Sequence, residues 1–232
     1  MKQLLNVLLL VLFALSIYSC KKKNELPNYA QFPSEALRDP LQTPTTRPPF
    51  EAQVGDQTHR VVPQFDYQIS GLVVSSGFSE NMAKRRNDDL NLMDVGLLWG
   101  SNLNPEIYQN ITFRNNGVWL HADAKDRKVW NRLDQNRLSN SHLICTDPAL
   151  SKRLKALHPG AIISIEGCLA DYSGRHSSTV RTDRGDGACE VIWVDQLTIL
   201  QDKTKPWALL STISLYSFLA LLLLKIIHFF IC

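Results

Sequence analysis

The stretch HPGAIISIEGCL, residues 158–169, contains the most regular pattern in this chain of 232 residues. After a Pro-Gly pair that ends helices, the side chains of Ile163, Ile165 and Leu169 fall on one face of an extended chain. The residues between them are mostly more polar than these three. An alternation of apolar and polar residues with a period of two predicts a strand that buries one of its faces. The stretch therefore predicts a β fold with a tight turn directly before this strand.

A helix is predicted immediately before that strand. Asp147 stands at the N-cap position and Pro148 at the first helical position, which these residue types favour. Apolar residues then recur at helical spacing, at Ala149, Leu150, Leu154 and Leu157. Residues 127–137 predict a second, less regular helix.

Four further segments have the composition of strands, namely residues 66–75, 92–99, 111–122 and 189–200. Within the third of them, Asn-Asn-Gly at residues 115–117 predicts a hairpin turn. Three strands, a helix and two strands is the order of elements in the OB-fold, a small Greek-key barrel.

Residues 147–200 resemble the corresponding part of single-strand-binding OB domains. In those domains a turn glycine precedes alternating aliphatic residues, and a second glycine lets the strand curl around the barrel; Gly160 and Gly167 take these places here. The resemblance implies a mainly β fold, a small OB-like Greek-key barrel with one or two helices over residues 66–202, but no ligand. The stretch GDGACE, residues 185–190, also resembles the last strand of an uncharacterised bacterial envelope family, which implies no activity.

Residues 1–19 have the features of a signal peptide. A positive start is followed by an apolar run from Leu4 to Ile17, which is short for a membrane span. The segment SIYSC, residues 16–20, resembles the lipobox of bacterial lipoproteins, which implies that Cys20 becomes the lipid-bearing (palmitoylated) first residue of the mature protein. The alternative is an uncleaved signal anchor.

The C-terminal residues 206–232 predict a transmembrane helix and a short tail. No charged residue occurs from Trp207 to Leu224, a stretch about long enough to cross the apolar core of a bilayer. Trp207 and Lys225 suit the two membrane interfaces.

Residues 20–65 predict a tether between the lipid and the domain. Seven of the eleven prolines of the chain lie in residues 24–65. Because proline lacks a backbone donor and fixes φ, this segment predicts an extended, Pro-rich linker.

The lysines around the predicted domain conflict with export. Five of them flank it, at positions 21, 22, 23, 203 and 205, whereas Lys2 and Lys225 lie on the far sides. The positive-inside rule alone would place the domain in the cytoplasm. Since a lipoprotein is exported through its signal peptide, we expect a periplasmic domain, held at the bacterial inner membrane by Cys20 and by the helix of residues 207–224.

Three cysteines lie in the predicted domain, Cys145, Cys168 and Cys189. If residues 160–171 and 188–200 pair antiparallel, Cys168 comes close to Cys189, and an oxidising compartment would join them in a disulfide. Cys145 would then be the odd thiol. Three reduced cysteines are the alternative, which a cytoplasmic domain implies.

Charge and spacing argue against nucleic acid, metal and cofactor. Residues 66–205 contain 17 Lys and Arg against 17 Asp and Glu, so the electrostatic attraction that nucleic-acid binding needs is missing. Asp183, Asp186 and Glu190 lack the ligand spacing of a calcium loop. We therefore expect no metal and no cofactor, and no nucleic-acid partner.

The densest polar cluster is SNSH, residues 139–142, with Cys145 nearby. His142 could act as a general base if a nucleophile lies beside it. No spaced catalytic motif accompanies it, and a loop histidine is the alternative.

Together these patterns favour a membrane-tethered, exported, non-enzymatic binding or assembly module of the bacterial cell envelope. Its expected partners are the bilayer and another envelope protein or a peptide. One competing hypothesis is an envelope hydrolase that uses His142 as its catalytic residue. Another is a cytoplasmic-side OB module that binds single-stranded nucleic acid.

Overall fold

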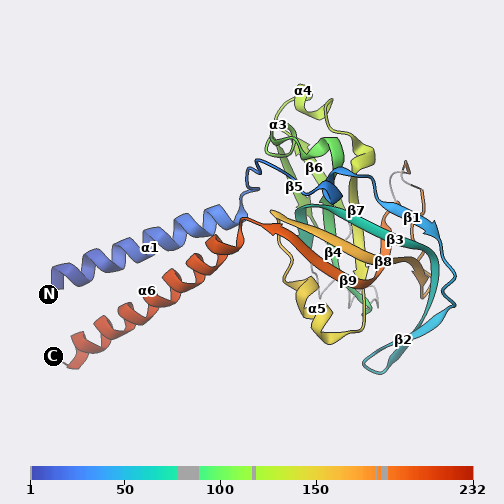
Figure 1. Cartoon of the computed structure of the whole chain (residues 1–232). Helices are drawn as coiled ribbons and strands as arrows, with labels where there is room; N and C mark the ends of the chain where they lie inside the picture. Colours follow the sequence, from blue (N-terminus) through green and yellow to red (C-terminus); the bar gives the residue numbers. More distant parts are fainter. Residues whose placement is uncertain (1, 78–88, 117–118, 181, 184–187, 232) are drawn as a thin grey trace. The chain divides into compact units, whose positions relative to one another are not determined.

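The computed structural model describes residues 2–77, 89–116, 119–180, 182–183 and 188–231. The chain divides into two compact units (Figure 1). We call Asn28–Gln201 the sheet unit, and we call Met1–Pro27 together with Asp202–Cys232 the helix unit.

Five strands of the sheet unit pair in a ring. In order across the sheet they are β3 (Gln57–Gly77), β4 (Asn91–Leu98), β7 (Leu138–Ile144), β9 (Glu190–Asp202) and β8 (Ala161–Tyr172). β8 also pairs back with β3, antiparallel, so that the two ends of this order are joined. β7 and β9 run parallel, with Ser141 opposite Glu190, which makes the sheet mixed. The predicted mainly β character is confirmed at the level of a sheet-rich unit.

Hydrophobic clusters cover both faces of this sheet. Leu143 belongs to the main cluster, which also contains Val95 and Ile163. Its neighbour Ile144 belongs to a second cluster, with Val191. Because successive residues of a strand point to opposite faces, the two clusters lie on opposite sides of β7.

Shorter elements surround the ring. β1 (Leu41–Pro44) and β2 (Phe50–Val54) pair with β3. Between β4 and β7 the chain forms α3 (Pro105–Tyr108), β5 (Ile111–Asn115), β6 (Leu120–Ala124) and α4 (Arg127–Trp130). β5 and β6 form a two-stranded antiparallel sheet, and residues 117–118, part of the stretch between them where a hairpin turn was predicted, lie outside the described residues. Three short 3-10 turns occur at Ser34–Leu37, Gly100–Leu103 and Gln135–Arg137.

The helix predicted after Asp147 is confirmed as α5 (Pro148–Lys155). Asp147 Oδ1 accepts a 2.6 Å hydrogen bond from the Leu150 amide, and the side chains of Leu150 and Leu154 are buried. The helix predicted for residues 127–137 is wrong in its length. Only the single turn of α4 and a 3-10 turn form there.

The polar cluster at 139–142 is a strand and not a loop. These residues form most of β7. The segment 111–122, which was predicted as the third strand, forms instead the separate β5–β6 hairpin. Ser139 and Ser141 are buried, and their hydroxyl groups hydrogen-bond each other at 3.0 Å. Because serines take buried positions of this strand, the sequence lacks the alternation of apolar and polar residues that predicts a strand.

The predicted tether of residues 20–65 is also corrected, because folded structure begins at Asn28. Tyr29 is 2% exposed, and its hydroxyl donates to the Gly160 carbonyl at 2.5 Å. Pro44 lies on the edge strand β1, and Pro63 lies at an irregularity in the β3–β8 pairing. Sheets tolerate proline at edges and bulges, so a high proline content did not prevent folding.

The helix unit consists of α1 (Lys2–Asn24) and α6 (Lys205–Ile231). Each contains a stretch long and apolar enough to cross a membrane, Gln3–Asn24 in α1 and Lys205–Ile227 in α6. The predicted C-terminal membrane helix is thus confirmed in its length and composition. α1 does not end at residue 19 but continues through Cys20.

Candidate functional site

Three neighbouring strands bring Asp94, His142 and Cys189 together. Asp94 on β4 is the direct partner of His142 on β7. His142 is in turn opposite Val191 on β9, and Cys189 directly precedes that strand. Asp94 and His142 alternate with the core residues Val95 and Leu143, so both point away from the main hydrophobic cluster.

A buried carboxylate holds the imidazole of His142. His142 Nδ1 lies 2.5 Å from Asp94 Oδ1, and Asp94 is 1% exposed. Asn91 Nδ2 donates to the same carboxylate oxygen at 3.1 Å. Burial of a carboxylate is costly unless it is paired, so His142 and Asn91 stabilise Asp94 in this position. The contact at Nδ1 fixes the plane of the ring and leaves Nε2 for another partner.

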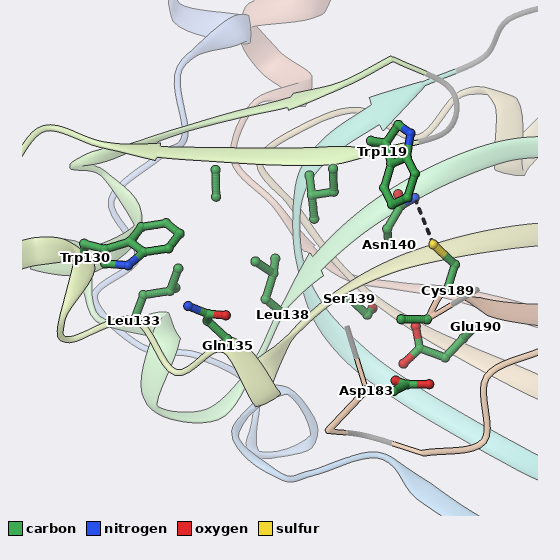
Figure 2. Close-up of a pocket in the computed structure, with 13 residues that line it drawn as sticks. Trp119, Trp130, Leu133, Gln135, Leu138, Ser139, Asn140, Asp183, Cys189 and Glu190 are labelled. Atoms are coloured by element: carbon green, nitrogen blue, oxygen red, sulfur yellow. Dashed lines mark hydrogen bonds between the residues drawn. The ribbon is translucent and has the colours of Figure 1, made fainter. Parts of the chain in front are cut away.

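Cys189 is the third member of this cluster. Its side chain lies near the imidazole of His142 and contributes to the raised pKa of that ring. Asn140 Nδ2 donates to Cys189 Sγ at 3.6 Å, as the dashed line in Figure 2 shows. Asn140 Oδ1 accepts a 2.7 Å hydrogen bond from Asn115 Nδ2, which fixes the end of the amide that faces the sulfur.

These neighbours favour the charged form of His142. Burial by itself lowers the pKa of the imidazole, but the hydrogen bond and the charge of Asp94, together with the nearby Cys189, raise it by more, to about 10. His142 is therefore an imidazolium at neutral pH. Cys189 thus has a cationic group as its neighbour.

A cavity of about 240 Å³ opens beside Cys189. Its lining residues come from β6, from the segment between α4 and β7, and from the chain before β9: Trp119, Leu120, Ala122, Trp130, Leu133, Gln135, Leu138, Ser139, Asn140, Asp183, Ala188, Cys189 and Glu190. In Figure 2, Trp119 lies near Asn140 and Cys189, whereas Trp130 and Leu133 lie at the opposite end. The two tryptophans are each 39% exposed, so they offer aromatic surface to a ligand.

A glycine lets the β5–β6 hairpin come close to the sheet here. A Cβ atom on Gly96 would lie 2.4 Å from Ser75 Oγ and 3.0 Å from Leu120 Cδ1. Leu120 also lines the cavity. The absence of a side chain two residues after Asp94 therefore allows the hairpin to cover the sheet beside the cluster.

A second histidine, His59, has similar neighbours elsewhere in the sheet unit. Its Nδ1 lies 2.7 Å from Ser173 Oγ, and its Nε2 lies 2.7 Å from Asp89 Oδ1. Ser173 is exposed and forms a tight turn with Gly174, with φ of 46° and 78°. These values are typical of the two-residue turn of a β-hairpin. None of these three polar residues lines the cavity at Cys189.

The predicted disulfide between Cys168 and Cys189 is not formed, since both are free thiols. A Cβ atom on Gly167 would lie 1.8 Å from the Trp193 carbonyl, so β8 meets β9 at Trp193 next to Cys168 and not at Cys189. The register expected from the sequence is therefore displaced by about four residues. Cys168 is fully buried, and burial raises its pKa to about 11.

Cys145, the predicted odd thiol, is also free and buried. Burial raises the pKa of this thiol, and its Sγ lies 3.3 Å from Ser151 Oγ. Among these three cysteines of the sheet unit, only Cys189 is partly exposed.

His142 was identified from the sequence, but its two partners were not. Asp94 is an acidic residue within the apolar stretch LMDVGLLW, and a charge inside a buried strand requires a partner. That signal could have pointed to Asp94. Cys189 was assigned to a disulfide, and its contact with His142 depends on the parallel pairing of β7 with β9.

The acidic residues that the sequence places near Cys189 do not form a metal site. Asp183 and Glu190 line the cavity, whereas Asp186 lies outside the described residues. In the part of the chain that the structure describes, no group of three or more His, Cys, Asp or Glu could hold a metal ion.

No protein-family model, curated protein or solved structure matches this chain.

Proposed function

We propose that the sheet unit is an OB-like barrel that carries a cysteine-dependent hydrolase. The ring of pairings β3-β4-β7-β9-β8, the parallel contact of β7 with β9 and the position of α5 before β8 all support this fold. In such barrels the second and third strands and the loop before the fifth form the usual binding face. Asp94, His142 and Cys189 belong to the corresponding elements here.

The observation that carries the proposed activity is the arrangement of Cys189, His142 and Asp94 on neighbouring strands, with Cys189 in the lining of a cavity. A nucleophile, a base beside it and a third group that orients the base form the set that acyl transfer requires. His142 contacts Asp94 through Nδ1, and Cys189 lies near enough to its imidazole to raise the pKa of the ring. These are the two neighbours that a catalytic histidine needs.

In the proposed reaction, the thiolate of Cys189 attacks the carbonyl carbon of an ester or amide, and the carbonyl electron pair moves onto oxygen. Asn140 Nδ2, already directed at the sulfur, is placed to donate to that oxygen. His142 then gives its proton to the leaving oxygen or nitrogen as the bond to carbon breaks. Water next attacks the resulting thioester and gives a proton to His142, and the thiolate of Cys189 leaves.

The reactivity of Cys189 tests this proposal without a known substrate. The full-length protein in detergent is treated with iodoacetamide, and the alkylation rate of each cysteine is followed by peptide mass spectrometry. We expect Cys189 to react at least about tenfold faster than Cys145 and Cys168. His142→Gln should slow the reaction of Cys189 about tenfold, whereas the matched variant His59→Gln should leave it unchanged. Equal rates in wild type and His142→Gln would disprove an activated thiol.

A second candidate is the non-enzymatic binding or assembly module, with a protein or peptide partner. The observation in its favour is the aromatic surface of Trp119 and Trp130, because exposed tryptophans are common at binding sites. Under this alternative, Trp119→Ala abolishes partner binding, while Cys189→Ala has no effect on it.

Either function belongs to a membrane-bound protein, since the helix unit contains two helices of membrane-spanning length. The lipobox resemblance favours an exported sheet unit with a lipid on Cys20. The packing of α1 favours a different arrangement.

A further inference from the structure

α1 and α6 pack against each other in antiparallel register. Lys225 Nζ donates to Asn6 Oδ1 at 2.8 Å, and the ring centroids of Phe13 and Phe218 lie 5.4 Å apart. The ends of the two helices marked N and C in Figure 1 lie on the same side of this pair. One register accounts for both contacts, which lie seven residues apart in each helix, so the two helices are paired over about two turns.

Serines occupy the contact between the two helices. Ser16 and Ser19 of α1, at 9% and 0% exposure, are buried like Ser211 and Ser214 of α6, at 6% and 1%. The same register brings Ser16 to within about one residue of Ser214. Small residues let membrane helices approach closely, and this contact is the main source of their association where no water is present.

The hydroxyl groups of two of these serines are satisfied within their own helices. Ser19 Oγ donates to the Leu15 carbonyl at 2.7 Å, and Ser214 Oγ donates to the Leu210 carbonyl at 2.7 Å. These two hydroxyl groups therefore need no partner from outside their helix. Ser19 and Ser214 can thus act as small packing residues within a bilayer.

α1 is long enough to span a membrane. The helical stretch Gln3–Asn24 has 22 residues, and at 1.5 Å per residue it extends about 33 Å, close to the thickness of a bilayer core. It continues past the apolar run into Lys21, Lys22 and Lys23, and lysines at a helix end suit a membrane interface. The bond between Ser19 and Cys20, which processing at the lipobox would break, lies inside this helix.

We infer that α1 is retained as a membrane-spanning helix paired with α6, and that the sheet unit faces the cytoplasm. A cleaved lipoprotein is exported through its signal peptide whatever the charges beside its domain. If α1 is retained, this reason for export is absent, and the positive-inside rule decides the orientation. Five lysines, at positions 21, 22, 23, 203 and 205, then flank the sheet unit, against Lys2 and Lys225 on the far side. The three thiols of the sheet unit also stay unpaired, as a reducing compartment requires.

The first test is retention of α1. The full chain with an N-terminal epitope tag is produced in a bacterium that processes lipoproteins, and the cells are fed an alkyne-bearing fatty acid. We expect the tag to remain on the membrane-bound protein, and we expect the label in wild type to equal that in Cys20→Ser. Loss of the tag together with a label that Cys20→Ser removes would overturn the inference.

The second test is the orientation of the sheet unit. Glu51→Cys places a thiol on an exposed position of β2, in a background in which Cys20, Cys189 and Cys232 are changed to Ser. A membrane-impermeant maleimide should label this thiol only after cell lysis, whereas a cysteine in a tag fused after residue 232 of the same background should be labelled in intact cells. Labelling of Glu51→Cys in intact cells would show an exported sheet unit and contradict the inference.

The third test is the helix contact itself. Phe13→Cys with Phe218→Cys, again without Cys20, should form a disulfide in membranes upon mild oxidation. The control pairs Val11→Cys with Phe218→Cys, because Val11 is two residues from Phe13 in the helix and therefore lies on the opposite face of α1. Cross-linking of the first pair should exceed that of the control about tenfold. Equal yields would show that the two helices do not pair in this register. None of these outcomes depends on the proposed hydrolase.

Discussion

Two histidines of the sheet unit have nearly the same polar neighbours, but their surroundings differ. His142 contacts Asp94 through Nδ1 and contacts Cys189 beside a cavity. His59 contacts Ser173 through Nδ1 and lies near Asp89 on its other side, and Ser173 belongs to an exposed turn.

A nucleophile, a base and an acid do not by themselves make a catalytic site. The cluster around Cys189 offers space for a substrate and a donor, Asn140, directed at the sulfur. In the cluster around Ser173, the histidine contacts a residue of an exposed hairpin turn. The proposed function therefore gives a catalytic role to His142 and a structural role to His59, and matched variants can separate the two.

The largest effect is expected for Cys189→Ala. Hydrolysis of a simple ester such as p-nitrophenyl acetate should fall at least about a thousandfold, because the attacking atom is removed. The matched variant Ser173→Ala should stay within about twofold of wild type. If Ser173→Ala lost the activity and Cys189→Ala kept it, the two assignments would be reversed.

Asp94→Asn should lower the same activity by about a hundredfold to a thousandfold, since the amide no longer stabilises the imidazolium or orients the ring. Asp89→Asn is its counterpart near His59 and should have almost no effect on turnover. Binding of a fluorescent ester analogue, measured alongside, should be similar in both variants. Equal losses of turnover in the two variants would remove the distinction between the clusters.

The stability of the sheet unit should depend on pH through His142. Its folded-state pKa of about 10 lies above the unfolded value near 6.5, so its stabilising effect is complete below about pH 6.5 and disappears as pH rises through about 10. Thermal unfolding in detergent should show wild type more stable than His142→Gln by about 2 kcal/mol at pH 6, with the difference vanishing near pH 10.5. In the Asp94→Asn background this pH-dependent difference should be much smaller. A difference that grows with pH would contradict the proposed ion pair.

Trp119→Ala should weaken substrate binding rather than chemistry. The side chain lies near Cys189 in the cavity, so its removal should raise KM roughly tenfold with little change in kcat. Val180→Ala, at an exposed position that does not line the cavity, serves as a control for surface truncation. A fall in kcat at constant KM would instead place Trp119 in the catalytic machinery.

The smallest effect is expected for His59→Gln. Ester hydrolysis should remain within about twofold of wild type, while the free energy of unfolding should fall by about 1 kcal/mol from the lost contact with Ser173. Chemical denaturation and initial rates measured on the same preparation check both statements. An unchanged stability with a lost activity would refute the structural role.

Much of the sheet unit could be predicted where local rules decide the structure. The cap at Asp147 and the spacing of Leu150 and Leu154 gave α5, and the alternation after Gly160 gave β8. β7 was missed because Ser139 and Ser141 are buried, and their hydroxyl groups find partners only in the folded sheet. For the same reason His142 was expected in a loop.

The segment before residue 65 shows that amino-acid composition alone does not predict whether a segment folds. Its prolines predicted an extended tether, yet Tyr29 is buried and β1 and β2 pair with β3. Proline excludes helix and central strand, but it does not exclude edge strands. The contacts that order this segment come from distant parts of the chain.

Local patterns in the sequence were enough to predict the apolar C-terminal helix α6, the capped helix α5 and the strand β8, because hydropathy, capping and alternation act between residues close in the chain. The same patterns predicted a signal peptide for the N-terminal segment, which instead forms the longer helix α1. The position of Cys189 near His142 instead of Cys168, and of Asp94 beside His142, became clear only in the folded sheet. These pairings depend on the parallel contact of β7 with β9 and on the register of β8, which are set by packing of the whole sheet. A shift of a few residues in one strand decides whether Cys189 lies next to Cys168 or next to His142, and no local pattern fixes that shift.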